Sequence, residues 1–279
     1  VMRAIVGFCI GLGFPLQSTL ALKLFDDEER PGVLGKATFV MALGSIVYMV
    51  LSGVLCDVDA SYVWLIHGVL IVPLVLVLVF LKEPREASDT KADEKEDGKK
   101  EKLPGMAVFA STMFMIIFFA FYPMILNMSA IIDYENLGSG AVTGIISSLF
   151  TIGNALAGKY TVPAGLVLWI AGMAVFGFGH NLPMIMIGVI VSGIAAQIVW
   201  PGTVNSFSEY VPESRLSLAS ALFVSGMNLG CFLTSFFISG VSTVTGNDNP
   251  RLPCMIGLVI VIVFAAVWSV VEVKRKRNS

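Results

Sequence analysis

The chain has 279 residues, of which 56% are hydrophobic and only 14% are charged, with a formal net charge of −2. Because a soluble domain carries about 25% charged residues, this composition excludes an ordinary water-soluble globular protein and predicts a polytopic membrane protein. A net charge this small says little about binding partners, and we expect no nucleic-acid partner.

The cysteines show no pattern of a metal site or a disulfide framework. They form no CxxC pair and no paired spacing along the chain, at Cys9, Cys56, Cys231 and Cys254. We interpret them as reduced packing residues, and we expect neither a metal nor another cofactor.

Nine apolar stretches are long enough, or nearly so, to cross a bilayer. A transmembrane α-helix needs about 20 predominantly apolar residues. The stretches are apolar on most faces rather than alternating, which favours helices over the strands of a barrel. We therefore predict an all-α polytopic membrane protein with about nine transmembrane helices, at residues 2–24, 36–55, 61–81, 105–131, 139–158, 164–179, 183–205, 217–243 and 252–272.

A charged segment separates the third stretch from the fourth. Residues 82–102 hold seven basic and eight acidic residues and no large apolar side chain, so the segment cannot bury enough apolar area to fold alone. We predict the remainder of an N-terminal bundle of three helices (1–81), a solvated linker (82–104), and a C-terminal six-helix bundle with a basic tail (105–279).

Lysine and arginine are distributed unevenly between the loops. If the C-terminus lies inside and the helices alternate, 16 of the 18 basic residues fall on the inner side. Of the other two, Arg251 lies in an outer loop and Arg3 within the first stretch. Because basic residues gather on the cytoplasmic side, we expect a multi-pass protein of the cell membrane whose C-terminus and 82–104 linker are cytoplasmic.

The first three stretches resemble the last three. Gly7 and Pro15 match Gly193 and Pro201 at an offset of 186 residues, and the paired stretches share the same orientation. This is the pattern of two six-helix halves related by an axis along the membrane normal. Twelve spans are then expected. Since alternation also places Val1 outside without a leader sequence, we expect three helices to be missing from the front.

The repeat and two motifs resemble the major facilitator superfamily, from its fourth to its twelfth helix. "RAIVG", in which Arg3 precedes Gly7 by four residues, is similar to the family's fourth-helix motif. "DDEERPG" is similar to the acidic–Arg–Gly cluster of the family's next turn, and the charged linker falls where the family has its long central loop. The resemblance implies a major facilitator fold lacking its first three helices and a rocker-switch transporter.

Charged residues are almost absent from the predicted spans. All 20 acidic residues lie in loops or at helix ends, and only Arg3 stands inside a stretch. Charges in the hydrocarbon region are functional candidates by default. The resemblance implies that Arg3 faces the central cavity, where it would bind an anionic group or take part in proton transfer. In the alternative, its side chain extends to the outer interface.

Uncharged polar side chains supply the other binding candidates. An unpaired amide is unfavourable in lipid, so such residues turn inward, where they bind substrate or form hydrogen bonds between helices. Pro123 leaves a backbone carbonyl free one turn earlier in its helix, which favours the segment around it. With Arg3, the predicted substrate-binding residues are Tyr122, Asn127, Asn154, Gln197 and Asn228.

His67 is a second candidate, beside Arg3, for proton coupling, because histidine titrates near physiological pH. The alternative is a structural histidine near a helix end. No His–carboxylate pair, metal-ligand cluster or nucleophile elbow occurs in the sequence, so we predict no enzymatic activity and no catalytic residue.

The sequence therefore predicts a secondary active transporter of a small organic solute, acting as a monomeric permease. Proton-coupled symport is favoured, and sodium is the other ion considered. The expected partners are the small-molecule substrate and the lipid bilayer. The alternatives are a drug efflux pump of the same family, a non-transporting receptor or sensor of the same fold, and a pore.

Overall fold

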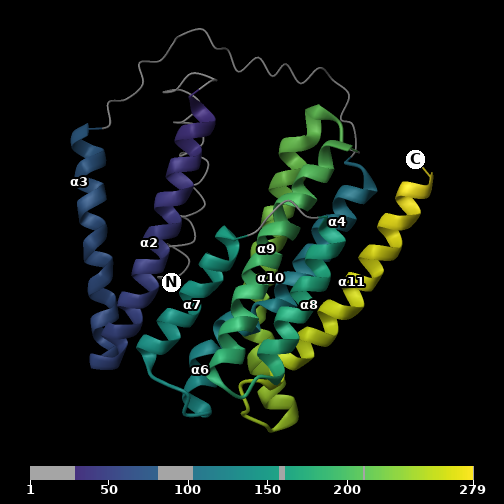
Figure 1. The fold of residues 1–279 in the computed structure, drawn as a ribbon. Helices are drawn as coiled ribbons and strands as arrows, with labels where there is room; N and C mark the ends of the chain where they lie inside the picture. The colour runs from purple at the N-terminus through teal and green to yellow at the C-terminus, as the bar shows by residue number, and fades with distance from the viewer. Residues whose placement is uncertain (1–28, 81–102, 157–160, 210, 279) are drawn as a thin grey trace. The chain divides into compact units, whose positions relative to one another are not determined.

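The computed structural model describes residues 29–80, 103–156, 161–209 and 211–278, and all secondary structure in these ranges is helical (Figure 1). The predicted all-α polytopic fold is therefore confirmed. The described residues form two compact units, the first made of 29–48 and 64–80, and the second made of 49–63 and the residues from 103 onward. The predicted span 2–24 and the 82–102 segment lie outside the described residues.

The first described helices cover the predicted spans 36–55 and 61–81. Helix α2 is Arg30–Val58, and Pro31 stands in its first turn, where the missing N–H needs no partner. The next span differs from the single α-helix that the sequence predicts, because it consists of a 3-10 helix, η1 (Ala60–Leu70), followed by α3 (Ile71–Phe80). Pro73 stands in the first turn of α3, so the α-helix begins where proline is tolerated.

Six helical stretches in the described residues are long and apolar enough to cross a bilayer. They are Phe39–Val58, Ala60–Phe80, Gly105–Leu126, Leu182–Val204, Leu218–Thr245 and Leu252–Val271. Two shorter apolar helices, Gly140–Ala155 and Val162–Phe178, cover the two remaining predicted spans. The side chains of α3 are all exposed although all are apolar, which is the surface expected of a lipid-facing helix.

The second unit contains the remaining helices. The predicted span 105–131 is divided into three pieces, α4 (Gly105–Phe121), α5 (Pro123–Leu126) and α6 (Met128–Tyr134). The spans that follow are α7 (Gly140–Ala155), α8 (Val162–Phe178), α9 (Leu182–Ser206), α10 (Glu213–Thr245) and α11 (Leu252–Asn278), with the 3-10 turn η2 (Phe207–Glu209) after α9. Helices α10 and α11 extend beyond their predicted spans into charged sequence.

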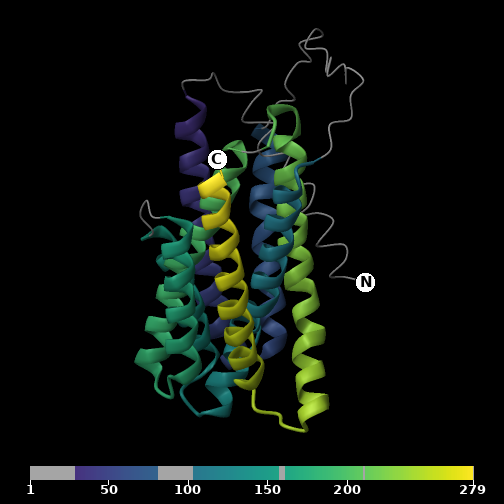
Figure 2. The ribbon, with the colours of Figure 1, turned by 90° about the vertical axis from the view of Figure 1, so that its right-hand side faces the viewer.

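Helix α4 lies at the centre of this unit. It packs against α10 and α11, while α8 packs against α9 and α11, and α7 against α9; these long helices run alongside one another in both ribbon views (Figures 1 and 2). Aromatic side chains fill the core: Phe114, Phe121, Trp169, Phe176, Phe207 and Phe223 are all almost completely buried. The Trp169 ring packs edge-on against Phe121, 4.9 Å between centroids, and so joins α8 to the end of α4.

Two glycines bring the backbones of α7 and α9 into contact. A Cβ atom on Gly153 would lie 2.3 Å from the Ile190 carbonyl oxygen, and one on Gly193 would lie 2.3 Å from the Phe150 carbonyl oxygen. Both distances are far below van der Waals contact. Small residues at such a crossing are the usual means of close helix packing in a bilayer.

The N-terminus of α7 is capped by an aspartate within the same unit. Asp57 accepts hydrogen bonds from the backbone N–H of Gly140 at 2.5 Å and of Ala141 at 2.9 Å. Ser139, at the N-cap position, makes no side-chain capping bond of its own. The carboxylate therefore satisfies two of the free N–H groups in the first turn and interacts favourably with the helix dipole.

Candidate functional site

The helix that carries two of the predicted binding residues is interrupted where Pro123 stands. Helix α4 ends at Phe121, Tyr122 forms a turn, and the four-residue α5 follows. Proline has no N–H to donate to the carbonyl four residues earlier, which belongs to Phe119. That oxygen instead accepts a hydrogen bond from the Thr234 hydroxyl of α10, at 3.1 Å. The predicted free carbonyl is thus present, and it is satisfied from a neighbouring helix.

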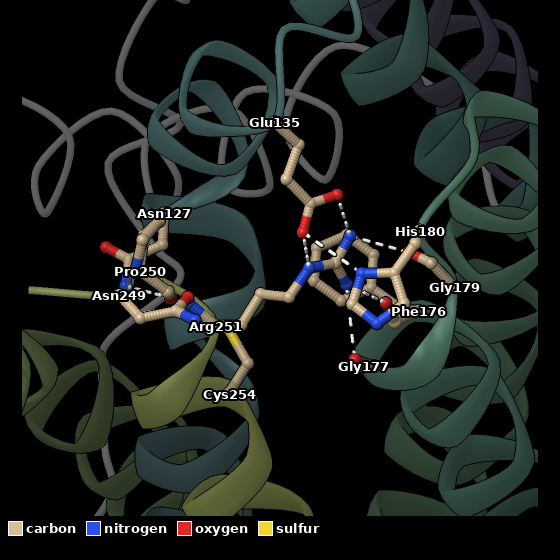
Figure 3. A network of polar contacts seen from close by, with 10 residues as sticks. All are labelled: Asn127, Glu135, Phe176, Gly177, Gly179, His180, Asn249, Pro250, Arg251 and Cys254. Atoms are coloured by element: carbon tan, nitrogen blue, oxygen red, sulfur yellow. Dashed lines mark hydrogen bonds and ion pairs between the residues drawn. The ribbon is translucent and has the colours of Figure 1, made fainter.

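Asn127 lies at the second interruption, between α5 and α6. Its side chain is 8% exposed, and Nδ2 donates a 2.9 Å hydrogen bond to the carbonyl of Pro250 in the loop before α11 (Figure 3). This hydrogen bond therefore joins the end of α5 to the loop before α11. Tyr122, at the first interruption, is half-buried.

The other predicted amides lie on three different helices. Asn154, near the end of α7, has a buried Oδ1 without a hydrogen-bond donor within the described part of the chain. Gln197 of α9 is exposed. Asn228 of α10 is exposed as well, and its Nδ2 donates to the Val224 carbonyl of its own helix at 3.0 Å. No hydrogen bond given by the structure joins any two of these predicted residues over the described ranges.

Of the two candidates for proton coupling, only His67 lies among the described residues. His67 lies in η1, where its ring stacks on that of Trp64 with 5.6 Å between centroids. Arg3 lies outside the described residues. Among the residues that are described, no group of three or more His, Cys, Asp or Glu side chains could hold a metal ion.

The sequence analysis missed a buried ion pair at one end of the second unit. Arg251, in the turn before α11, has a side chain only 6% exposed, and its guanidinium faces Glu135, which follows α6 (Figure 3). Nε donates to Glu135 Oε1, and Nη2 donates to Oε2 at 2.7 Å. The pair is therefore bidentate, the geometry in which an arginine–carboxylate interaction is strongest.

The same guanidinium also caps the C-terminal end of α8 by donating hydrogen bonds to its carbonyl oxygens. Nη1 donates to the carbonyls of Phe176 at 2.7 Å and Gly177 at 3.2 Å, and Nη2 donates to that of Gly179 at 2.5 Å. All five N–H donors of Arg251 are thus used. The last carbonyls of a helix have no partner within it and carry partial negative charge, so a cation there is favourable. Arg251 consequently joins α6, α8 and α11.

The sequence analysis assigned Arg251 to an outer loop, and the structure shows its side chain almost completely buried. The charge is neutralised by Glu135 and surrounded by backbone oxygens, so the side chain is buried. The available signal was the coincidence of acidic residues in "DYENLGSG", Glu135 among them, with the basic Arg251 of "GNDNPR", in loops assigned to the same side. That signal does not show burial.

The Glu135–Arg251 pair predicts a loss of stability in acid. Hydrogen bonds from Arg251 hold the pKa of the Glu135 carboxyl below its ordinary value of about 4.3. The folded state therefore binds fewer protons than the unfolded state, and the stabilisation is complete above the ordinary pKa and lost as the pH falls through the lowered one. We expect thermal unfolding in detergent, followed from pH 7 to pH 3, to show this loss in the unmodified chain.

Glu135→Gln should flatten this part of the pH profile, because the amide does not titrate. Asp133→Asn, two residues earlier at an exposed position of α6, is the matched control and should leave the profile unchanged. An identical acid dependence in the Glu135→Gln variant would contradict the assignment.

The arrangement of the second unit is that of a membrane-embedded helical bundle with an interrupted central helix and amides on its neighbours. Comparison with known proteins agrees with this architecture. A family model described as Major Facilitator Superfamily matches the chain in two stretches, residues 1–162 and 157–279. No curated protein and no solved structure gave a significant match. Since the two stretches together span the whole chain, the protein belongs to the Major Facilitator Superfamily.

Proposed function

We propose that the protein is a secondary active transporter that moves a small organic solute across the cell membrane by rocker-switch alternating access. Family membership over the whole length is the observation that carries this proposal, because members of this superfamily are membrane transporters. The apolar composition of the described helices agrees with it, because six of their stretches are long and apolar enough to cross a bilayer.

The proposed binding set contains the residues expected from the sequence: Arg3, Tyr122, Asn127, Asn154, Gln197 and Asn228. Within this set, Asn154 has the strongest support from the described residues, because its buried Oδ1 has no donor there and a hydroxyl or ammonium group of a solute would supply one. Such a set binds neutral or anionic polar solutes through hydrogen bonds.

The proposal includes proton-coupled symport by a monomer. It also includes the division of the chain into an N-terminal bundle (1–81), a cytoplasmic linker (82–104) and a C-terminal bundle (105–279) whose C-terminus is cytoplasmic. Arg3 and His67 are the residues proposed to take part in coupling. Acidic residues are missing from the interior of the described spans, and this favours coupling through such basic side chains or through residues outside these spans.

Uptake into proteoliposomes loaded with a pH-sensitive dye tests the proposal. The purified chain is presented with radiolabelled sugars, organic anions and dipeptides, one at a time, and protein-free vesicles serve as the control. We expect saturable uptake of one class together with acidification of the lumen. Uptake that does not saturate would indicate a pore, and binding without uptake would indicate a receptor. Either result would overturn the proposal.

A drug efflux pump is the second candidate, and a groove in the second unit favours it. The groove has a volume of about 350 Å³ and is lined only by apolar side chains from α4, α10 and α11: Met115, Ile116, Phe119, Leu233, Ile260 and Phe264. It suits a lipophilic molecule better than a sugar. ATP-independent, proton-driven export of a fluorescent lipophilic cation, with no uptake of the polar solutes, would favour this candidate over symport.

A further inference from the structure

We propose that Thr234 positions the candidate binding segment by supplying the hydrogen bond that Pro123 removes from α4. The Thr234 side chain is completely buried, and its Oγ1 lies 3.1 Å from the Phe119 carbonyl oxygen, 115 residues away in the chain. In an uninterrupted helix this oxygen would accept from the N–H of residue 123. The inference rests on the proposed function only in calling the adjoining segment a binding site.

Close approach of the two helices makes this hydrogen bond possible. Gly230 stands one turn before Thr234 on α10, and a Cβ there would lie 2.3 Å from the Met115 carbonyl oxygen and 3.1 Å from the Phe119 nitrogen. The backbones of α10 and α4 are therefore in direct contact at this level. A threonine side chain is short, and it reaches the α4 main chain because Gly230 allows that contact.

The hydroxyl has one proton and two acceptors. Thr234 Oγ1 also lies 3.0 Å from the carbonyl oxygen of Gly230, which stands four residues earlier in the same helix. If the proton turns fully to Gly230, the Phe119 oxygen is left without a donor in an apolar core, which is unfavourable. The cross-helix acceptor is the one that has lost its normal partner, so it is the one that depends on Thr234.

The far end of the same segment is held in a similar way. Asn127 Nδ2 donates to Pro250 in the loop that follows α10. The segment from Phe119 to Asn127, which contains α5, is thus held at one end by a side chain of α10 and at the other by the loop after α10. A displacement of α10 must therefore move Tyr122 and Asn127 with it, or break one of these two hydrogen bonds.

A double-mutant cycle on the full chain tests the inference. The variants are Thr234→Val, Pro123→Ala and both together, and the readout is the midpoint of thermal unfolding in detergent. A hydrogen bond of this kind contributes about 1 kcal/mol, so Thr234→Val should lower the midpoint by about 2–4 °C while Pro123 is present. In the Pro123→Ala background, residue 123 has an N–H to donate, and the same change should have little effect.

Hydrogen exchange supplies the local readout. In Thr234→Val, the amides of the peptide covering residues 119–127 should exchange faster, and Thr234→Ser, which keeps the hydroxyl, should restore slow exchange. Thr203→Val is the matched control, since Thr203 of α9 is also completely buried and donates to its own helix at Val199 O, 2.9 Å away. This variant should leave the 119–127 peptide unchanged.

Equal destabilisation by Thr234→Val in both backgrounds would overturn the inference, because it would show a packing effect unrelated to Pro123. Failure of Thr234→Ser to restore exchange would also overturn it. Neither measurement uses a solute, so a negative uptake experiment would count against the proposed transport and leave this result intact.

Discussion

Replacing Arg251 by leucine should lower the free energy of unfolding by about 3 kcal/mol, because removing one partner of a buried ion pair leaves the other charge uncompensated. The variant would leave the Glu135 carboxylate, whose side chain is 15% exposed, with the exposed His180 ring 3.3 Å from Oε1 and without the guanidinium, and it would remove the donor to the terminal carbonyls of α8. Thermal unfolding of the purified protein in detergent, together with the yield of monodisperse protein, measures the effect.

Three further variants show whether the pair, rather than the size of the residue, is responsible. Arg251→Lys keeps the charge but cannot make the bidentate contact, so an intermediate loss is expected. The double variant Arg251→Leu with Glu135→Leu removes both charges and should recover part of the stability. Arg215→Leu, at a half-buried arginine in the first turn of α10, is the control. Unchanged stability in Arg251→Leu would contradict the structure of this network.

Replacing Gly193 by valine should separate α7 from α9 and destabilise the second unit by about 3 kcal/mol, at the upper end of the effects of overpacking. The Cβ of any residue at this position would lie 2.3 Å from the Phe150 carbonyl oxygen and 3.2 Å from the Gly153 Cα. Both neighbours are backbone atoms, so no side-chain rotation relieves the clash. Size-exclusion chromatography and thermal unfolding measure the loss.

Gly240→Val is the matched control for this prediction. Gly240 lies within α10, and a Cβ there would meet no atom within 4 Å. The two substitutions have the same intrinsic effect on helix propensity. A loss of similar size in both variants would show that propensity, and not the α7–α9 contact, accounts for the destabilisation.

Hydropathy predicted the spans of this protein well, because a bilayer imposes a minimum apolar length on every helix that crosses it. It could not predict how each span is built internally. Residues 61–81 and 105–131 are both strongly apolar stretches, yet the first contains a 3-10 helix and the second is interrupted twice. Proline positions indicate where such interruptions are tolerated, but tertiary packing decides which helix form continues.

The contacts around the candidate site could be predicted only in part. Pro123 indicated that a carbonyl would need a donor, since the missing N–H is a property of proline itself. The donor, Thr234, lies 115 residues after Phe119, whose carbonyl it satisfies, and nothing local distinguishes it from the other threonines of α10. Arg251 and Glu135 are separated by 116 residues and were assigned as loop charges, so their burial follows only from the way the helix ends meet.

The Arg251 network also has a consequence for the order of assembly during synthesis. Its acceptors, Glu135 and the carbonyls of Phe176, Gly177 and Gly179, all precede the arginine by at least 72 residues. Every acceptor is therefore synthesised long before the donor. The Glu135 carboxylate and the C-terminal end of α8 must stay hydrated until α11 has been synthesised and packs against them. Nascent chains that stop before residue 251 should be recognised as incomplete by proteases that detect exposed, unpaired helix ends.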